Sequence, residues 1–367
     1  MRETWRLAGQ CLMVGFDGLT PSAEVRQLIR EHGVGGIILF ARNVVEPEQL
    51  AGLVADLQGI ARTAGHEMPL LVGIDQEGGR VARLRHPWIE WPPMRLLGHV
   101  GSEDLVRRLG VALAEQLTPC GIRLDFAPVV DVDTNPNNPV IGDRSFGDDP
   151  SLVARFGAAL IGGLQGSGVA ACAKHFPGHG DTDRDSHLEL PSLDHSRVRL
   201  DDVELAPFRA AVAAGVAAAM TAHVVVRALD DGVPATLSSR VVRGVLRQEM
   251  GFGGVVVSDD LEMQAIAKSW SAGAAAVGAV RAGCDLLLVC HSADAQAEAH
   301  EALVKAVETE TIAFADLEDA ALRVRRMKER FVPRQGTPSW QAADWRRVAQ
   351  SHRLLAEEIA SCARALA

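Results

Sequence analysis

The chain has 367 residues, none of which is tyrosine, and aromatic side chains make up only 4% of the sequence. It also lacks a cluster of Lys and Arg, and its formal net charge is −10 with a pI near 5.7. Nucleic acids and anionic membranes bind basic surfaces, so both are poor candidate partners. No apolar run approaches the roughly 18 residues that a membrane span needs. We therefore expect no nucleic-acid partner and no membrane partner.

Cysteine is sparse as well. The six cysteines are scattered without a C-x-x-C pair, and several lie in apolar runs, where they are typical of small buried side chains in a reducing compartment. The first residues, Met1–Leu7, lack the apolar stretch of a signal peptide. We expect a cytoplasmic protein and take a monomer as the default oligomeric state.

Apolar residues make up 47% of the chain and charged residues 23%, which predicts a folded protein with a sizeable core. Short apolar runs recur with enough residues between them for a crossover helix and its loops, as parallel strands require. Eight runs are predicted to be strands: Cys11–Phe16, Gly36–Phe40, Leu70–Ile74, Leu124–Pro128, Val169–Ala173, Ala217–Thr221, Gly254–Val257 and Asp285–Cys290. Helical composition occurs between or after them, at Ala158–Ile161, Ala210–Val216, Glu301–Val307 and Arg323–Arg330.

Eight strands that alternate with helices predict an α/β fold, namely a single-domain (β/α)8 TIM-like barrel over residues 1–332. A doubly wound open sheet is the alternative, but no G-x-G-x-x-G follows the first run. Residues 333–367 are predicted to form a linker, from Pro333 to Pro338, and a C-terminal helical segment, from Trp340, that packs on the barrel.

A barrel places the residues that follow its strands together at one face. Polar residues follow five of the eight runs, starting at Asp75, Asp131, Lys174, Thr221 and Ser258. Each alone would pass for an ordinary turn, because Asp, Asn and Gly favour turns. Five in the same relative position indicate a functional face.

The densest of these segments runs from Lys174 to His187. Pro177 and two glycines forbid a continued strand or a helix there, which places Lys174 and His175 at the end of a strand and the remainder in an exposed loop. Asp185 precedes His187 by two residues, so its carboxylate can accept the imidazole N–H and raise the proton affinity of the ring. Alone, such a pair more often only satisfies a turn.

Cleavage of a glycosidic bond needs a proton donor and a group that stabilises an oxocarbenium ion. The sequence offers His187, oriented by Asp185, as the donor and Asp259, at a strand end, as the nucleophile. Asp259 and Asp260 could instead cap the following helix, Glu262–Ala267, and one could cap while the other reacts. The side chains available to bind sugar hydroxyls through charged hydrogen bonds are Asp75, Arg83, Arg144, Lys174 and His175.

Three of these motifs together resemble glycoside hydrolase family 3, and within it the bacterial β-N-acetylglucosaminidase branch of peptidoglycan recycling. They are Asp75–Val81, Lys174–His187 and Ser258–Leu261, with further similarity at Gly35–Asn43 and Asn138–Phe146. The resemblance covers the chain from about Gly15 to about Cys290, and the segment beyond Val332 is assigned no catalytic role.

The resemblance implies a TIM-like barrel and retaining hydrolysis of terminal, non-reducing N-acetyl-β-glucosamine through a glycosyl-enzyme intermediate. It implies that Asp259 is the nucleophile and that His187, paired with Asp185, is the acid/base. The sugar would be bound by Asp75, Arg83, Arg144, Lys174 and His175. The implied substrate is N-acetylglucosaminyl-1,6-anhydro-N-acetylmuramic acid with or without its peptide, and no metal or organic cofactor is implied.

Three alternatives remain at this point. A metal-dependent hydrolase could use His175, His179, His187 and His223 with Asp259, although Pro177 prevents the helical pairing of His175 with His179 that a zincin needs. A sugar-binding protein could keep the pocket and lack catalysis. Finally, the glycosyl group could be transferred to phosphate instead of water.

Overall fold

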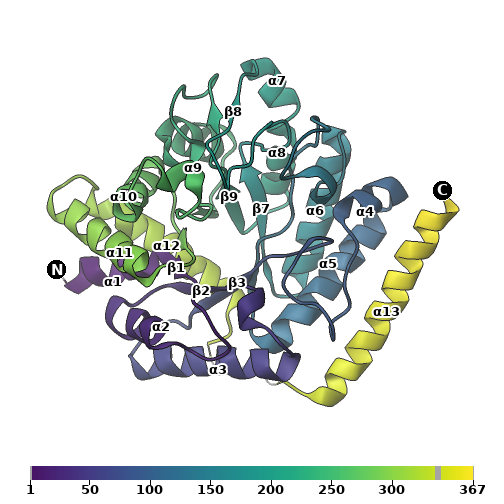
Figure 1. The fold of residues 1–367 in the computed structure, drawn as a ribbon, viewed down its shortest axis with the longest axis horizontal. Helices are drawn as coiled ribbons and strands as arrows, with labels where there is room; N and C mark the ends of the chain where they lie inside the picture. The colour runs from purple at the N-terminus through teal and green to yellow at the C-terminus, as the bar shows by residue number, and fades with distance from the viewer. Residues whose placement is uncertain (1, 335–339, 367) are drawn as a thin grey trace.

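The computed structural model describes residues 2–334 and 340–366, and within them eight strands form one parallel sheet (Figure 1). The strand order is β11-β9-β7-β6-β3-β2-β1-β12, and a bridge from Val257 to Leu286 joins the two ends into a nearly closed barrel. The predicted (β/α)8 fold is therefore confirmed. The barrel strands are β1 (Leu12–Val14), β2 (Gly36–Leu39), β3 (Leu71–Ile74), β6 (Leu124–Asp125), β7 (Ala170–Phe176), β9 (Ala218–Thr221), β11 (Val255–Val257) and β12 (Leu287–Val289).

Alternation of side chains along each strand builds two apolar layers. Around β12, Leu286 and Leu288 belong to the cluster inside the barrel, whereas Leu287 and Val289 belong to the cluster between the sheet and the helices. Both faces are buried, which explains why the strands read as short continuous apolar runs in the sequence.

Helices surround the sheet and shield its outer face (Figure 1). Those between or after the barrel strands are α2 (Ala23–Gln27), α3 (Pro47–Thr63), α5 (Glu103–Leu117), α6 (Pro150–Gly166), α8 (Ala206–Ala213), a π-helical segment (Arg240–Glu249), α10 (Ala272–Ala282) and α11 (Ala293–Glu308). Shorter elements lie in the loops: α4 (Met94–Val100), α7 (Arg197–Asp202), α9 (Gln264–Ala267), and the strand pairs β4–β5 (Gln76–Gly78, Val81–Ala82) and β8–β10 (Ser192–Leu193, Val225–Val226).

Two helices close the end of the barrel opposite the polar loops. Helix α1 (Arg2–Gln10) leads into β1 and packs on α12 (Phe314–Phe331), whose Met327 and Phe331 join the apolar cluster inside the barrel. The buried ammonium of Lys328 donates a hydrogen bond of 2.8 Å to the Gln10 side chain. This end is therefore filled, and the open end is the one where the strands finish.

Helix α13 (Ala342–Ala365) lies along α4 and α5 at one flank of the molecule (Figure 1). The rings of Trp345 and Trp88 meet edge to face at 6.0 Å between centroids. Arg108 of α5 makes two hydrogen bonds to the Glu358 carboxylate. The linker predicted at 333–338 falls largely on residues 335–339, outside the described residues, and the division of the chain at residue 332 stays a prediction. No described helix is long and apolar enough to cross a bilayer.

Glycine permits a very close approach of α5 and α6. A Cβ added at Gly163 would lie 2.2 Å from the carbonyl oxygen of Arg107, and one added at Gly110 would lie 2.7 Å from the carbonyl oxygen of Leu160. Both contacts are with backbone atoms, which cannot move away as a flexible side chain can.

Replacement of Gly163 by alanine should therefore destabilise the protein, by about 1–3 kcal/mol for an overpacked core site. Gly166→Ala on the same helix is the matched control, because a Cβ there meets no atom within 4 Å and alanine favours a helix. Thermal unfolding followed by circular dichroism compares the two. A Gly163→Ala midpoint at or above that of Gly166→Ala would contradict this packing.

Candidate active site

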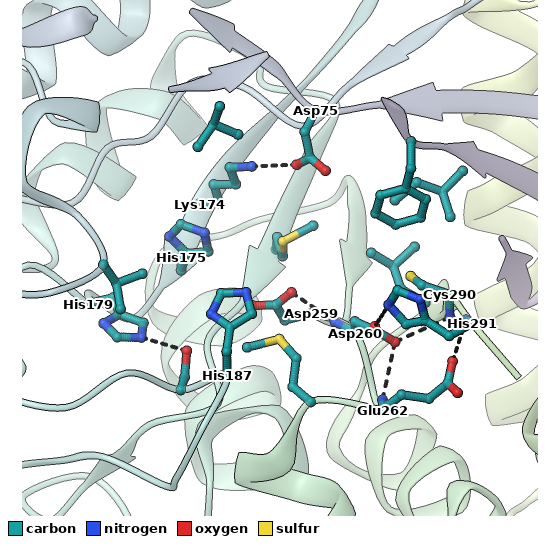
Figure 2. A pocket seen from close by; sticks show the side chains of 18 of the residues that line it. Asp75, Lys174, His175, His179, His187, Asp259, Asp260, Glu262, Cys290 and His291 are labelled. Atoms are coloured by element: carbon teal, nitrogen blue, oxygen red, sulfur yellow. Dashed lines mark hydrogen bonds and ion pairs between the residues drawn. The ribbon is translucent and has the colours of Figure 1, made fainter. Parts of the chain in front are cut away.

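A cavity of about 330 Å³ opens at the carboxyl ends of the barrel strands (Figure 2). Its lining includes residues that follow β2, β3, β11 and β12 and residues at the end of β7, so segments far apart in sequence meet there. The predicted site residues that line it are Asp75, Arg83, Arg144, Lys174, His175, His187 and Asp259. Asp185 lies behind His187, and its carboxylate is hydrogen-bonded to the His187 ring.

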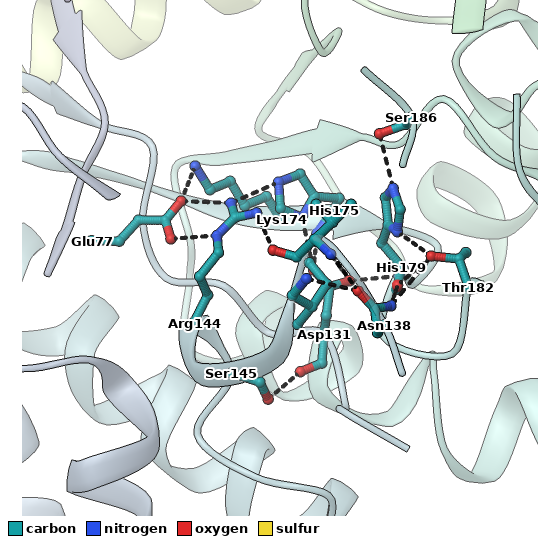
Figure 3. Close-up of polar contacts among 12 residues, drawn as sticks. Glu77, Asp131, Asn138, Arg144, Ser145, Lys174, His175, His179, Thr182 and Ser186 are labelled. Carbon is teal, nitrogen blue, oxygen red and sulfur yellow. Dashed lines mark hydrogen bonds and ion pairs between the residues drawn. The ribbon is translucent and has the colours of Figure 1, made fainter. Parts of the chain in front are cut away.

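A buried charge network forms one wall of the cavity (Figure 3). The Lys174 ammonium lies 2.8 Å from Asp75 Oδ1 and 2.6 Å from Glu77 Oε1, and it is 2% exposed. Arg144 binds both oxygens of Glu77, at 2.9 and 2.8 Å, and Arg83 reaches Asp75 at 3.2 Å. Each buried carboxylate, Asp75 and Glu77, thus has cationic partners, and the Lys174 ammonium lies between the two, as buried charges require.

The network keeps its members charged. Burial alone would raise the pKa of Glu77, but Arg144 and Lys174 outweigh it and hold that pKa well below the ordinary value. Burial would likewise lower the pKa of Lys174, but Asp75 and Glu77 raise it above the ordinary value. The wall therefore presents fixed positive and negative groups, which suit hydrogen bonds to sugar hydroxyls.

Asp131 orients His175. The Asp131 carboxylate lies 2.7 Å from His175 Nδ1 and accepts the backbone N–H groups of His175 and His179. On the other side of the ring, a guanidinium N–H of Arg144 lies 3.3 Å from Nε2. Because arginine can only donate, Nε2 carries the lone pair and Nδ1 donates to Asp131. His175 thus has a defined tautomer at the pocket.

The two adjacent aspartates after β11 have different environments. Asp260 Oδ1 accepts the backbone N–H groups of Glu262 and Cys290, so this carboxylate stabilises the turn. Asp259 Oδ1 accepts only the Asp260 N–H, at 2.8 Å, among the described residues, and Asp259 lines the cavity. The prediction that one of the two aspartates caps the following helix is wrong, because α9 begins at Gln264 after the N-cap residue Met263, which has no side-chain cap. Asp260 instead holds the turn before α9 and leaves Asp259 at the cavity.

His223, at the end of β9, supports this turn. Its Nε2 lies 2.9 Å from the Asp260 carbonyl oxygen and its Nδ1 lies 2.8 Å from Thr236 Oγ1. Burial would raise the pKa of Asp259, but His223, His175 and the Asp260 N–H outweigh it and hold the pKa below the ordinary carboxyl value. Asp259 is therefore an anion at neutral pH.

The loop that follows β7 carries the Asp185–His187 pair over the cavity. His187 Nδ1 lies 2.8 Å from Asp185 Oδ1, and the His187 side chain is 62% exposed. Burial would raise the pKa of Asp185, but hydrogen bonds from the backbone and ring of His187 lower it. The carboxylate is therefore charged and accepts Nδ1–H of His187, and among the described residues Nε2 of His187 has no hydrogen-bond partner.

The prediction that this loop is exposed was partly wrong, because its first half is buried. The strand also continues through Lys174 and His175 to Phe176. Gly180 allows the burial, since a Cβ there would lie 1.8 Å from the Val132 carbonyl oxygen. Exposed residues occur only from Asp183 onward.

Sequence reasoning missed several residues of the site. Glu77 stood in a recognised motif without a role, and Asp131 was seen only as a polar residue after a strand. Their positions in the sequence could have indicated them, since Glu77 follows β3 and Asp131 follows the fourth predicted strand. Beside the cavity, the Phe40 ring packs against His291 at 5.7 Å between centroids, and the Arg42 guanidinium carbon lies 4.3 Å from the centroid of the Phe40 ring.

The histidines considered as metal ligands are engaged in hydrogen bonds. His179 and His223 each use both ring nitrogens, and His175 uses Nδ1 for Asp131. Within residues 2–334 and 340–366, no group of three or more potential ligands has the geometry to hold a metal ion. In the part of the chain that the structure describes, the side-chain arrangement thus offers no ligand set for the metal-dependent alternative.

Comparisons with known proteins agree with this geometry. Residues 6–327 match the family described as glycosyl hydrolase family 3, N-terminal domain, so the chain belongs to that family and is a glycoside hydrolase. The β-hexosaminidase of Nitrosomonas eutropha is 39% identical over 293 residues, which cover 78% of this chain and 82% of that protein.

Two solved structures are informative. A family 3 β-N-acetylglucosaminidase from Paenibacillus sp. str. FPU-7 superposes with a TM-score of 0.90 at 43% identity, covering 98% of this chain and 68% of that one. NagZ from Neisseria gonorrhoeae, in complex with N-trifluoroacetyl-D-glucosamine, superposes with a TM-score of 0.77 at 33% identity, covering 96% and 98%.

Burial makes the folded protein sensitive to acid at His179. Burial, with a smaller effect of His175, lowers the pKa of His179 to about 4 from an ordinary 6.5. As the pH falls from 7 to 5, the unfolded chain binds a proton at His179 that the folded protein does not, so the free energy of unfolding decreases.

Between pH 7 and pH 5, the free energy of unfolding should decrease less in His179→Ala than in the wild type, and the difference should be about 1–2 kcal/mol. Denaturant unfolding at both pH values measures this. The control is His99→Ala, which removes an exposed imidazole on α4 and should keep the wild-type pH dependence. An identical loss in the wild type and in His179→Ala would contradict a neutral, buried His179.

Proposed function

We propose that this protein is a retaining exo-β-N-acetylglucosaminidase that cleaves terminal, non-reducing N-acetylglucosamine. The observation that carries the proposal is the pairing of two groups at one cavity: the anionic Asp259 on the rigid barrel and the Asp185–His187 pair on a loop. Relatives named β-hexosaminidase and the amino-sugar complex of the Neisseria NagZ support the choice of sugar.

In the first step, an oxygen of Asp259 attacks C1 of the bound sugar as the glycosidic bond breaks. Asp259 Oδ1 is held by the Asp260 N–H, which leaves Oδ2 as the attacking atom. The free Nε2 of His187 donates its proton to the departing oxygen, and the positive charge on the ring is stabilised by the Asp185 carboxylate. The products are a glycosyl ester on Asp259 and a neutral imidazole.

In the second step, Nε2 of His187 takes a proton from a water molecule as its oxygen attacks C1. The bond to Asp259 breaks, and both groups return to their starting charge. A carboxylic acid in the role of His187 would be an anion at this stage, whereas the imidazole is neutral. The neutral base adds no repulsion toward the attacking group, and the same feature would admit phosphate in place of water.

The buried network orients the sugar. Asp75, Arg83, Arg144, Lys174 and His175 are fixed by one another and by Glu77 and Asp131, so their donors and acceptors are in place before substrate binds. Preorganised polar groups of this kind place C1 within reach of Asp259 without a cost of reorganisation.

As the natural substrate we propose N-acetylglucosaminyl-1,6-anhydro-N-acetylmuramic acid, with or without its peptide, in cytoplasmic cell-wall recycling. Phe40 and His291, which line the cavity and pack against each other, offer an aromatic ring and an imidazole to the part of the substrate beyond the cleaved bond. We expect the enzyme to act as a monomer without a metal or organic cofactor.

The test compares 4-nitrophenyl N-acetyl-β-D-glucosaminide with the matching β-glucoside. We expect nitrophenol release only from the N-acetyl substrate. Asp259→Ala should lower the rate by several orders of magnitude, because it removes the attacking oxygen. The initial rate is measured by absorbance with and without phosphate and with and without chelator.

Two outcomes would contradict the proposal, and a third would change the acceptor in it. Folded wild-type protein that releases nitrophenol from neither substrate would favour a sugar-binding protein without catalysis. Release that is unchanged in Asp259→Ala would exclude Asp259 as the nucleophile. A rate that rises with phosphate, with a sugar phosphate as product, would replace water by phosphate as the acceptor.

A further inference from the structure

His179 lies inside the loop that carries His187, and the mechanism above gives it no role. Its side chain is buried, and its two ring nitrogens point to two different loop residues (Figure 3). Nδ1 lies 2.7 Å from Thr182 Oγ1, and Nε2 lies 3.0 Å from Ser186 Oγ. Ser186 stands between Asp185 and His187 in the chain, so the ring spans the segment that leads to the proposed acid.

The backbone of His179 is hydrogen-bonded to residues at the wall of the cavity. The His179 backbone N–H donates to Asp131 Oδ1 at 2.7 Å, and Asp131 also orients His175. The His179 carbonyl oxygen accepts a hydrogen bond of 2.8 Å from the side-chain amide of Asn138. His179 thus connects the buried wall of the site to the partly exposed outer part of the same loop through hydrogen bonds of its backbone and of its ring.

The hydrogen-bond pattern defines the protonation of the ring. Thr182 has one hydroxyl proton, and its Oγ1 lies 3.0 Å from the His179 carbonyl oxygen, which can only accept. Thr182 therefore donates there and accepts from Nδ1–H of His179. Nε2 is left as the acceptor for the Ser186 hydroxyl, and the low pKa of His179, caused by burial, agrees with this neutral form.

The position of His187 depends on such support. Among the described residues, Asp185 is the one hydrogen-bond partner of the exposed His187 side chain, and Asp185 lies on the same loop. On its outer side the loop contacts α9 and the residue that follows it: the Ala265 N–H donates to the Ser186 carbonyl oxygen at 3.3 Å, and the Lys268 ammonium donates to the Leu188 carbonyl oxygen. On the inner side, His179 makes the corresponding contact.

We propose that His179 is a positioning residue: through Thr182 and Ser186, its neutral imidazole holds the Asp185–His187 pair where His187 can protonate the leaving group. The proposal rests on the acid role given to His187 above. Misplacement of a reacting group by about 1 Å can cost a hundredfold in rate. Loss of the His179 ring should therefore lower kcat for substrates that need the acid and change KM little.

A double-mutant cycle tests this with wild type, His179→Ala, His187→Ala and the double variant. Each is assayed on a dinitrophenyl N-acetyl-β-glucosaminide, whose leaving group needs no proton, and on N,N′-diacetylchitobiose, whose leaving group does. On chitobiose we expect His187→Ala to lose about 10²-fold or more and His179→Ala about tenfold or more. In the His187→Ala background, removal of His179 should cost less than about twofold, because the two residues act as one unit.

Two controls separate positioning from general damage. Ser186→Ala removes a single hydroxyl from the His179 contact and should reproduce part of the chitobiose defect in a protein of near wild-type stability. Arg184→Ala, which removes an exposed ion pair with Glu189 on the same loop, should leave both substrates unchanged. Thermal unfolding of each variant shows that the comparison is between folded proteins.

The outcomes for His179 and for His187 are distinguishable. Equal losses on both substrates in His179→Ala, or the same fold-loss with and without His187, would overturn the positioning role. Equal losses on both substrates in His187→Ala would instead overturn the acid role of His187 in the proposed function. A chitobiose-specific loss in both single variants, without further loss in the double variant, supports both.

Discussion

The buried ammonium of Lys174 is the constraint on which the rest of the site depends. A buried cation is stable only with matched counter-charges, and Lys174 finds them in Asp75 and Glu77 from the loop after β3. Glu77 in turn fixes Arg144, which lies against His175. Because β7 and β3 are separated by only one strand in the sheet, the barrel brings these charges together without long, flexible connections. In the proposed function, charge balance at this wall determines where the sugar binds.

The site divides into a rigid part and a loop-borne part. Asp259 belongs to the rigid part, since it follows β11 directly and its neighbour Asp260 is held by backbone groups and by His223. The proposed acid, His187, belongs to the loop and is exposed. We infer that the hydrogen bonds of His179 position His187 relative to Asp259. His179 is itself bound to Asp131, the carboxylate that also orients His175. Under the proposed mechanism, this division would allow substrate to enter while the Asp259 carboxylate stays fixed.

Much of this could be predicted from the sequence, for physical reasons. Strands buried on both faces give continuous apolar runs, and each of the eight runs overlaps one barrel strand. Polar residues after the strands had to meet at one face once the barrel was assumed, which explains why most predicted site residues line one cavity. The contacts of Glu77, Asp131 and His179 could not be predicted, because they depend on which carboxylate or ring nitrogen lies within 3 Å of which partner. The burial of the first half of the His187 loop was missed because glycine signals a turn but not a close approach to backbone, as at Gly180.

The central claim is that Asp259 forms a covalent bond with the sugar, and trapping of that intermediate tests it most directly. A 5-fluorinated N-acetylglucosaminyl fluoride carries a good leaving group, whereas its ring fluorine slows release of the glycosyl ester from the enzyme. Mass spectrometry of the intact protein and of its peptides would then locate the label. The account predicts one sugar per chain, on the peptide that contains Asp259. A label on another residue, or a product of inverted anomeric configuration, would contradict it.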